Sequence, residues 1–370
     1  MSKRGYIVLS IWCLSIIIIV ILSLTVGKGD KVKNNNDELY EKMTEASELA
    51  KKAMDAIKEY KKDNGIPLSS EDVLETGMIG TGSKTTITTT EGVIEAKRTS
   101  CNPEWAAVIV RIIYKAGLKE GDEVGMIFSG SFPALNICAM AASQVCGLKS
   151  SIMASIGASY YGANQTECTF FDMSNYLFDL GIMNKKVDYF SLGGADDIGY
   201  TFKEPFRTEI IERINSSSSE FIYEEDYRKN IDGRLKILNE NVPDMKLMIN
   251  CGGTIVAYGQ GLNVFSETGY FKGYKNRRTL NEVINNRGDN YGLLQCVRLM
   301  GVDVFSMKDL KTLSEAYGIP YDPSTMPEIG TSDVFYENNY NMTFPIIGLV
   351  ISMVFGIIIF MDRKKYWIFK

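Results

Sequence analysis

Residues 123–156, EVGMIFSGSFPALNICAMAASQVCGLKSSIMASI, contain the pattern that decides the fold. Glu123 to Phe128 is a short apolar run typical of a buried strand, and Ser150 to Ile156 is a second one. Between them, Pro133 to Cys146 predicts an apolar helix that Gly147 closes. A strand, a helix and a second strand in close succession are typical of a parallel sheet with a crossover helix.

The same alternation continues on both sides of this stretch. Upstream, Asn102 and Pro103 begin a helix that ends at Gly117, and Thr85 to Thr90 has an extended pattern. Downstream, we expect strands at 187–192, 245–250 and 302–305, and helices near 171–180, 204–215, 224–240, 291–300 and 307–316. The alternation predicts an α/β fold with a mostly parallel, doubly wound, Rossmann-like sheet covered on both faces.

Another helix precedes this region and runs from Asp37 to about Asn64. Asn36 can cap its first turn, and Gly65 stops it. Its apolar residues are spaced alternately by four and three positions: Leu39, Met43, Ala46, Ala50, Ala53, Ile57 and Tyr60. This heptad seam has two interpretations, namely packing on the chain's own domain or self-association through residues 37–64.

Two uncharged apolar runs lie near the chain ends, from Tyr6 to Val26 and from Phe344 to Met361. Each is long enough to cross a bilayer as a helix, which needs about 20 residues. The second run is followed by a basic tail, which the positive-inside rule places in the cytoplasm; two spans then bring the N-terminus to the same side. A cleaved signal peptide is the alternative for the first run, and a buried core helix is the alternative for either.

These patterns divide the chain into five parts. The expected parts are an N-terminal transmembrane anchor at 1–26, a stalk and heptad-patterned helix at 27–66, an external α/β domain at 67–335, a C-terminal transmembrane helix at 344–361 and a basic cytoplasmic tail at 362–370. We therefore expect a two-pass protein of the cell membrane, with both termini in the cytoplasm and the main domain outside.

The composition excludes several functions. The net charge is −5, and basic residues gather at the two ends, so the part between the apolar runs is more acidic than the whole chain. Nucleic acid is therefore not an expected partner, and a polyanion would need a local pocket. The absence of histidine excludes Ser-His-Asp and Cys-His catalysis within the chain and histidine-ligated zinc. We expect no metal or cofactor, and hydrolysis would need a Ser-Lys pair, a carboxylate pair or a carboxylate-bound metal.

Six of the seven cysteines lie between the apolar runs: Cys101, Cys138, Cys146, Cys168, Cys251 and Cys296. An external location permits disulfides. Their scattered spacing in a large domain instead favours buried free thiols.

Four expected strands run directly into turns rich in glycine and serine. In a parallel sheet such turns emerge at one edge, where ligands bind, and small residues let backbone N–H groups approach an anion. The candidate ligand-binding residues are Ser129, Gly130, Ser131, Asn136, Gly157, Ser159, Gly193, Gly194, Asp196, Asp197, Gly252 and Gly253. We expect this group to bind a ligand that carries a carboxylate.

Several of these residues also have a purely structural interpretation. Ser131 can cap the helix that follows it, and the Gly-x-Ser-x-Gly spacing of a nucleophile elbow is absent. Asp196 and Asp197 could hold a divalent cation or act as acid and base, but adjacent side chains rarely point the same way. Lys97 and Arg98 are candidate counter-charges for an anion or partners in surface salt bridges.

Five blocks of this sequence resemble the bacterial poly-gamma-glutamate system protein family. They are TTTEGVIEAKRTSCNPEWAAVIVR from 88, SGSFPALN from 129, SIGASYYGAN from 155, SLGGADDIG from 191 and NCGGT from 250. The likeness covers about 85–330, and an N-terminal anchor also fits the family. It implies an accessory membrane protein of poly-gamma-glutamate synthesis or export, with the anionic polymer or a glutamate-like ligand and the synthase subunits as partners.

The resemblance implies a process and identifies no catalytic residues. Two alternatives therefore stay open beside an anion-binding accessory protein. One is a histidine-free hydrolase or transferase that acts on the polymer. The other is a structural scaffold for the synthase complex that uses the heptad seam for assembly.

Overall fold

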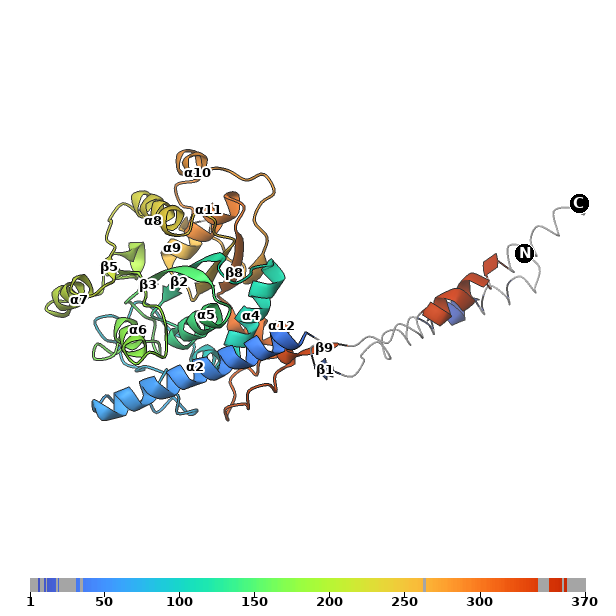
Figure 1. The fold of residues 1–370 in the computed structure, drawn as a ribbon, viewed down its shortest axis with the longest axis horizontal. Coiled ribbons are helices and arrows are strands. Elements are labelled where there is room, and N and C mark those ends of the chain that lie inside the picture. Colours follow the sequence, from blue (N-terminus) through green and yellow to red (C-terminus); the bar gives the residue numbers. More distant parts are fainter. Residues whose placement is uncertain are drawn as a thin grey trace, which may run out of the picture. The chain divides into compact units, whose positions relative to one another are not determined.

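The computed structural model describes residues 31–33, 36–261 and 264–338, and, nearer the ends, residues 6, 10, 12–17, 19, 346–354, 356 and 357. The chain forms two compact units, one from Asn36 to Phe335 and one that combines Met1–Asn35 with Tyr336–Lys370. The larger unit begins at Asn36 and so includes the heptad-patterned helix, which the sequence analysis grouped with the stalk in the part 27–66 (Figure 1).

The larger unit is built on a seven-stranded sheet in the order β5-β4-β3-β2-β6-β8-β7. The strands are β2 (Glu123–Ser129), β3 (Lys149–Ser155), β4 (Tyr189–Ser191), β5 (Glu220–Phe221), β6 (Leu247–Cys251), β7 (Gly269–Phe271) and β8 (Asp303–Met307). All neighbours pair in parallel except β7, which is antiparallel to β8. The mostly parallel α/β prediction is therefore confirmed. The strand order reverses between β2 and β6, which is the position where open α/β sheets bind ligands.

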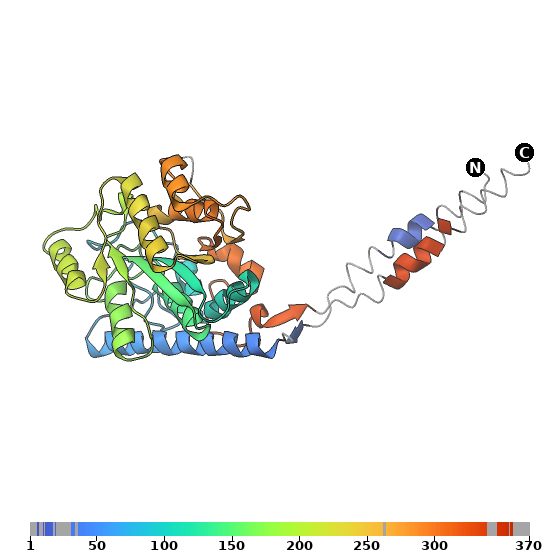
Figure 2. The same cartoon turned by 45° about the horizontal axis from the view of Figure 1, so that its top comes forward.

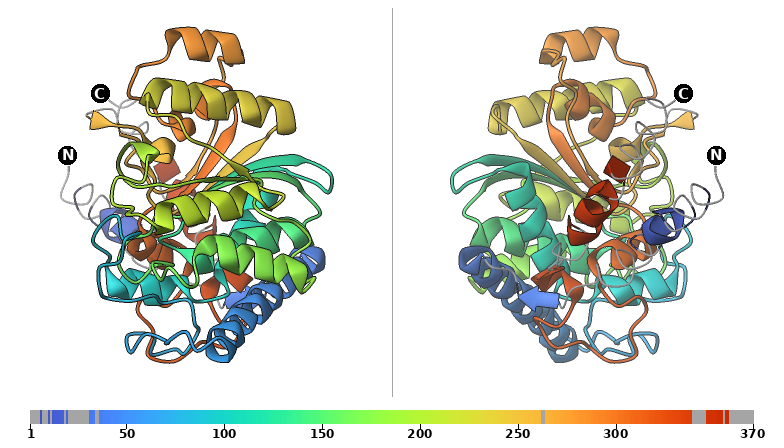
Figure 3. Two further views of the ribbon diagram at one scale, coloured as in Figure 1. Left: turned by 90° about the vertical axis from the view of Figure 1, so that its left-hand side faces the viewer. Right: turned by 90° about the vertical axis from the view of Figure 1, so that its right-hand side faces the viewer.

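Helices cover both faces of the sheet (Figure 3). They are α3 (Ile94–Ser100), α4 (Trp105–Ala116), α5 (Pro133–Val145), α6 (Phe170–Asp179), α7 (Phe206–Asn215), α8 (Tyr227–Asn241), α9 (Ile255–Tyr258), α10 (Leu280–Asn286), α11 (Leu293–Leu299) and α12 (Leu310–Tyr317). On one face, Ile127, Met248 and Val304 of the sheet pack against Leu235 of α8 and Val297 of α11 in a buried apolar cluster. Helix α5 packs on β2 and β6.

Helix α2 (Asp37–Asp63) forms a further layer outside α4 and α5 (Figure 2). The Asn36 side chain accepts a hydrogen bond from Leu39 N at 3.2 Å, as the capping pattern predicted. The seam residues from Leu39 to Ile57 are buried, and the small side chains of its alanines let α2 approach its neighbours closely. The seam is thus used within the chain, so self-association through 37–64 would need another face of α2.

In the smaller unit, β1 (Lys31–Lys33) pairs antiparallel with β9 (Tyr336–Asn338). Residues 12–17 and 346–354 are helical, and the Trp12 indole N–H donates to the Ser352 carbonyl at 3.2 Å. None of the helices that the structure describes is both long and apolar enough to cross a membrane. Much of the predicted spans 1–26 and 344–361, and all of the tail 362–370, lies outside the described residues.

Two local predictions have different outcomes. The stretch from Thr85 to Thr90 is not a strand: it forms turns with one isolated bridge, between Thr88 and Ala158. The reason is local, because the Thr88 hydroxyl accepts from Thr85 N at 2.9 Å and folds the backbone back on itself. By contrast, the prediction of buried free thiols is confirmed for all six cysteines between the apolar runs.

Candidate functional site

The four predicted turns meet at one edge of the sheet, which we call the carboxyl edge because β2, β3, β4 and β6 end there. In the register of the parallel strands, Ser129 pairs with Ser155, and Ser155 pairs with Ser191. Phe128 of β2 pairs with Cys251 of β6. The strands therefore stop at the same level, and the turns that follow them emerge together on both sides of the switch point.

Glycine lets these turns touch one another. A Cβ added to Gly130 would lie 2.7 Å from a carbonyl oxygen of the β3 turn, and one added to Gly193 would lie 2.8 Å from the Ser155 Cβ. Gly252, with φ of +90°, would place a Cβ 3.0 Å from the Ser129 Cβ. Side chains are therefore excluded where the backbones of neighbouring turns come into contact.

A chain of serine hydroxyls links the β2 turn to the β3 turn. Ser131 N donates to Ser129 Oγ at 3.1 Å, and Ser159 N donates to Ser131 Oγ at 2.9 Å. The Ser131 side chain makes no cap bond to α5, so the capping interpretation is wrong: its hydroxyl is used across the two turns. Asn136 donates from Nδ2 to Ser129 O at 2.9 Å, and its buried Oδ1 has no hydrogen-bond partner in the part of the chain that the structure describes.

Lys97 lies at the centre of this arrangement. Its amine donates to the Ser131 carbonyl and to Ser159 Oγ, the latter at 2.7 Å, and lies 3.8 Å from the centroid of the Phe132 ring. Only 2% of Lys97 is exposed, and no carboxylate within the described residues forms an ion pair with it. Burial lowers the pKa of Lys97 to about 7, because the charged form loses its hydration without gaining a counter-charge.

The sequence indicated Lys97 only as one of two candidate counter-charges. The structure separates the two, because Arg98 forms a partly exposed ion pair with Asp322 at 2.6 Å and Lys97 turns inward. A Cβ on Gly92 would come 2.2 Å from the Tyr160 carbonyl oxygen, so glycine lets the segment before α3 pack tightly against the turn after β3.

Asp196 and Asp197 have separate roles and do not face a shared site. Asp197 is buried, forms an ion pair with Arg234 and accepts from Ser191 Oγ at 2.8 Å. Asp196 is exposed and accepts from Gln260 Nε2 at 2.6 Å. Both have positive φ, of 52° and 67°. The expectation that adjacent carboxylates point apart holds, and neither is positioned to share a cation with the other.

The turn after β6, the fourth of the predicted turns, is fixed by hydrogen bonds from two polar side chains. The Gly252 carbonyl accepts from Asn250 Nδ2 at 2.9 Å and from the Tyr258 hydroxyl at 2.8 Å. Asn250 Oδ1, like Asn136 Oδ1, is buried and accepts no hydrogen bond from any residue that the structure describes. Gly253, the next residue in this turn, is exposed. The carboxyl edge thus combines one buried amine with several hydroxyls.

No family model, no curated protein and no solved structure matches this chain. The chemistry of the carboxyl edge is therefore the basis for assigning a function.

Proposed function

We propose that the protein is a membrane-anchored accessory protein of poly-gamma-glutamate synthesis or export. In this proposal the two apolar runs hold it in the cell membrane, the α/β domain faces outward, and the carboxyl edge binds a glutamate-like anion. The five resembling sequence blocks support the process. The observation that carries the binding function is the Lys97 amine, which is buried among serine-rich turns and has no carboxylate partner among the described residues.

The physical argument starts from the cost of this buried charge. A buried ammonium whose partners are a hydroxyl, a carbonyl and an aromatic ring has lost its hydration and lacks the opposite charge that would compensate for it. A carboxylate bound beside Lys97 would supply that charge, and each charge-assisted hydrogen bond contributes about 1.5–3 kcal/mol. This local interaction would let an acidic protein hold an anion that its overall charge repels.

A second candidate function has its own supporting observation. Lys97 Nζ lies 2.7 Å from Ser159 Oγ, and a pKa near 7 leaves much of the amine neutral at physiological pH. A neutral lysine can accept the proton of a serine hydroxyl as that oxygen attacks an amide carbonyl. The same proton would pass to the leaving amine, and water would release the acyl group. This is the histidine-free hydrolysis that the composition leaves open.

The test is a calorimetric titration of short γ-linked glutamate peptides into the full-length protein in lipid nanodiscs. We expect saturable binding at millimolar concentrations and at least a tenfold loss of affinity in Lys97→Met, since methionine preserves the apolar stem and removes the amine. Arg98→Met is the matched control and should bind normally. Absence of saturable binding in the unaltered protein would contradict the proposal.

The two candidates are separated by product analysis in the same samples. Hydrolysis predicts release of shorter glutamate chains, a covalent adduct of a fluorophosphonate on Ser159, and loss of both in Ser159→Ala. Binding alone predicts intact peptides and no adduct. A folded Lys97→Met protein, checked by circular dichroism, is required for either conclusion.

A further inference from the structure

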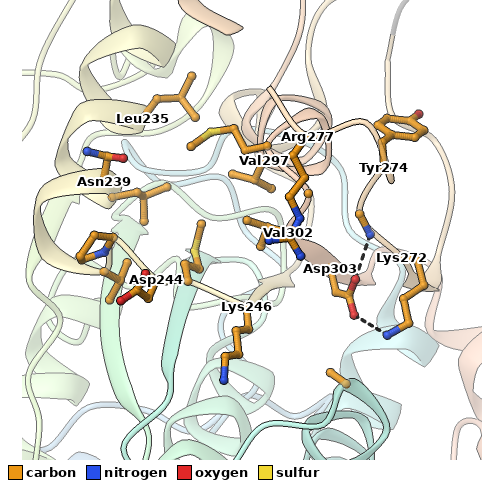
Figure 4. A pocket seen from close by; sticks show the side chains of 18 of the residues that line it. Leu235, Asn239, Asp244, Lys246, Lys272, Tyr274, Arg277, Val297, Val302 and Asp303 are labelled. Atoms are coloured by element: carbon orange, nitrogen blue, oxygen red, sulfur yellow. Dashed lines mark hydrogen bonds and ion pairs between the residues drawn. The ribbon is translucent and has the colours of Figure 1, made fainter. Parts of the chain in front are cut away.

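A cavity of about 840 Å³ lies at the opposite end of the sheet, where β6 and β8 begin (Figure 4). We call this the amino edge. Leu235 of α8, Val297 of α11 and Val302 before β8 contribute an apolar wall. The loop 272–277, which follows β7, contributes a polar rim that includes Lys272, Lys275 and Arg277. The volume lies within the range of small-molecule sites, and the lining combines this apolar wall with many polar groups.

The loop that carries the basic rim is fixed by its backbone. Gly273 N donates to Asp303 Oδ1 at 2.9 Å, and Tyr274 N and Arg278 N donate at 2.9 Å to carbonyls at the end of α11. A Cβ on Gly273 would lie 2.2 Å from the Gly301 carbonyl carbon, so only glycine allows this approach. The basic side chains are therefore presented by a positioned backbone.

The charged side chains around the cavity do not all neutralise one another. Lys246 pairs with Asp122 at 2.7 Å, and Lys272 pairs with Asp303 at 2.9 Å. Lys275 and Arg277 form no ion pair with any described residue. Among the described residues that line the cavity, two basic groups, Lys275 and Arg277, and one acidic group, Asp244, thus form no ion pair.

Arg277 is aimed into the cavity. Its side chain lies across Gly301, where an added Cβ would come 2.4 Å from the Arg277 Cγ. Its guanidinium reaches the level of Val302 (Figure 4). These basic side chains are not needed to satisfy the carbonyls at the end of α11, because backbone N–H groups of the loop already bond them. These side chains are therefore available to bind a ligand.

We propose that the amino-edge cavity binds a small organic anion with an apolar body and a terminal carboxylate or phosphate. The planar guanidinium of Arg277 matches either group through paired hydrogen bonds, Lys275 adds a second positive charge, and the apolar wall receives the body of the ligand. This site goes beyond the proposed function, because it shares no residue with the carboxyl edge and does not depend on Lys97.

The probes are phenyl phosphate and benzoate, with benzyl alcohol as the uncharged control, titrated into the full-length protein in nanodiscs. We expect saturable binding of at least one anion at low millimolar concentration and none of the alcohol. A preference for phenyl phosphate would indicate a phosphate ester as the natural ligand class, and a preference for benzoate a carboxylate. Absence of saturation by both anions at 10-fold higher concentration would overturn the proposal.

Single substitutions test whether the anion binds in the amino-edge cavity. Arg277→Gln should weaken anion binding at least tenfold, and Lys275→Gln should weaken it severalfold. Arg278→Gln removes the neighbouring charge, which does not line the cavity, and should have no effect; Lys97→Met should also leave this binding unchanged. Equal losses in Arg277→Gln and Arg278→Gln would mean that the anions respond to general surface charge, and this would refute the site.

Discussion

The two edges of the sheet hold their positive charge in opposite ways. At the carboxyl edge, Lys97 is buried, its partners are hydroxyl and carbonyl oxygens, and its pKa falls to about 7. At the amino edge, Arg277 is exposed at a cavity rim, and arginine stays charged at any physiological pH. Ligand binding at the first edge should therefore be coupled to protonation of Lys97, whereas binding at the second should respond mainly to salt.

The largest expected effect concerns the buried ion pair that supports the carboxyl edge. Asp197→Asn should lower the free energy of unfolding by about 3–5 kcal/mol, because it leaves the Arg234 charge buried without compensation. Asp196→Asn, next to it in a similar backbone conformation, should change stability by less than about 0.5 kcal/mol because Asp196 is exposed. Urea unfolding followed by Trp105 fluorescence measures both, and equal effects would refute this distinction.

A smaller effect follows from the titration of Lys97. Its pKa is lowered on folding, so between about pH 7 and 10 the unfolded chain binds more protons than the folded one, and stability rises with pH. The unaltered protein should therefore gain up to about 1.4 kcal/mol per pH unit relative to Lys97→Met across this range. Urea unfolding at pH 6, 7, 8 and 9 tests this, and a difference that is constant with pH would show that Lys97 does not titrate there.

The smallest effect is expected at the amino edge. Lys272 is largely exposed, so its ion pair with Asp303 is screened by water. Lys272→Met should change the free energy of unfolding by less than about 1 kcal/mol. A loss comparable to that of Asp197→Asn would mean that the two edges do not differ in burial as described.

Much of the fold could be predicted from the sequence, because apolar strand runs alternate with capped helices. The convergence of four turns at one edge followed from parallel pairing alone. The order of the strands could not be predicted in this way, since the reversal between β2 and β6 depends on contacts between residues far apart in the chain. The strands β5 and β7 also could not be predicted, because they are too short to show an alternation of apolar and polar residues.

The central residue of the candidate site was the hardest to predict. Lys97 lies in a polar stretch that is typical of a surface, and Arg98 beside it is partly exposed. The burial of Lys97 depends on how α3 packs beneath the turns after β2 and β3, and such tertiary contacts cannot be predicted from the local sequence. Conversely, Asp196 and Asp197 were prominent in the sequence, but the structure gives Asp197 an internal partner.

The most direct test of the account is the number of protons taken up when a γ-linked glutamate peptide binds at pH 7. Titration calorimetry in buffers of different ionisation enthalpy gives this number. With a free pKa of about 7 for Lys97, which a bound carboxylate would raise, uptake should be about 0.5 proton per peptide and should vanish in Lys97→Met. Binding without proton uptake, or equal uptake in both proteins, would contradict the claim that Lys97 holds the ligand.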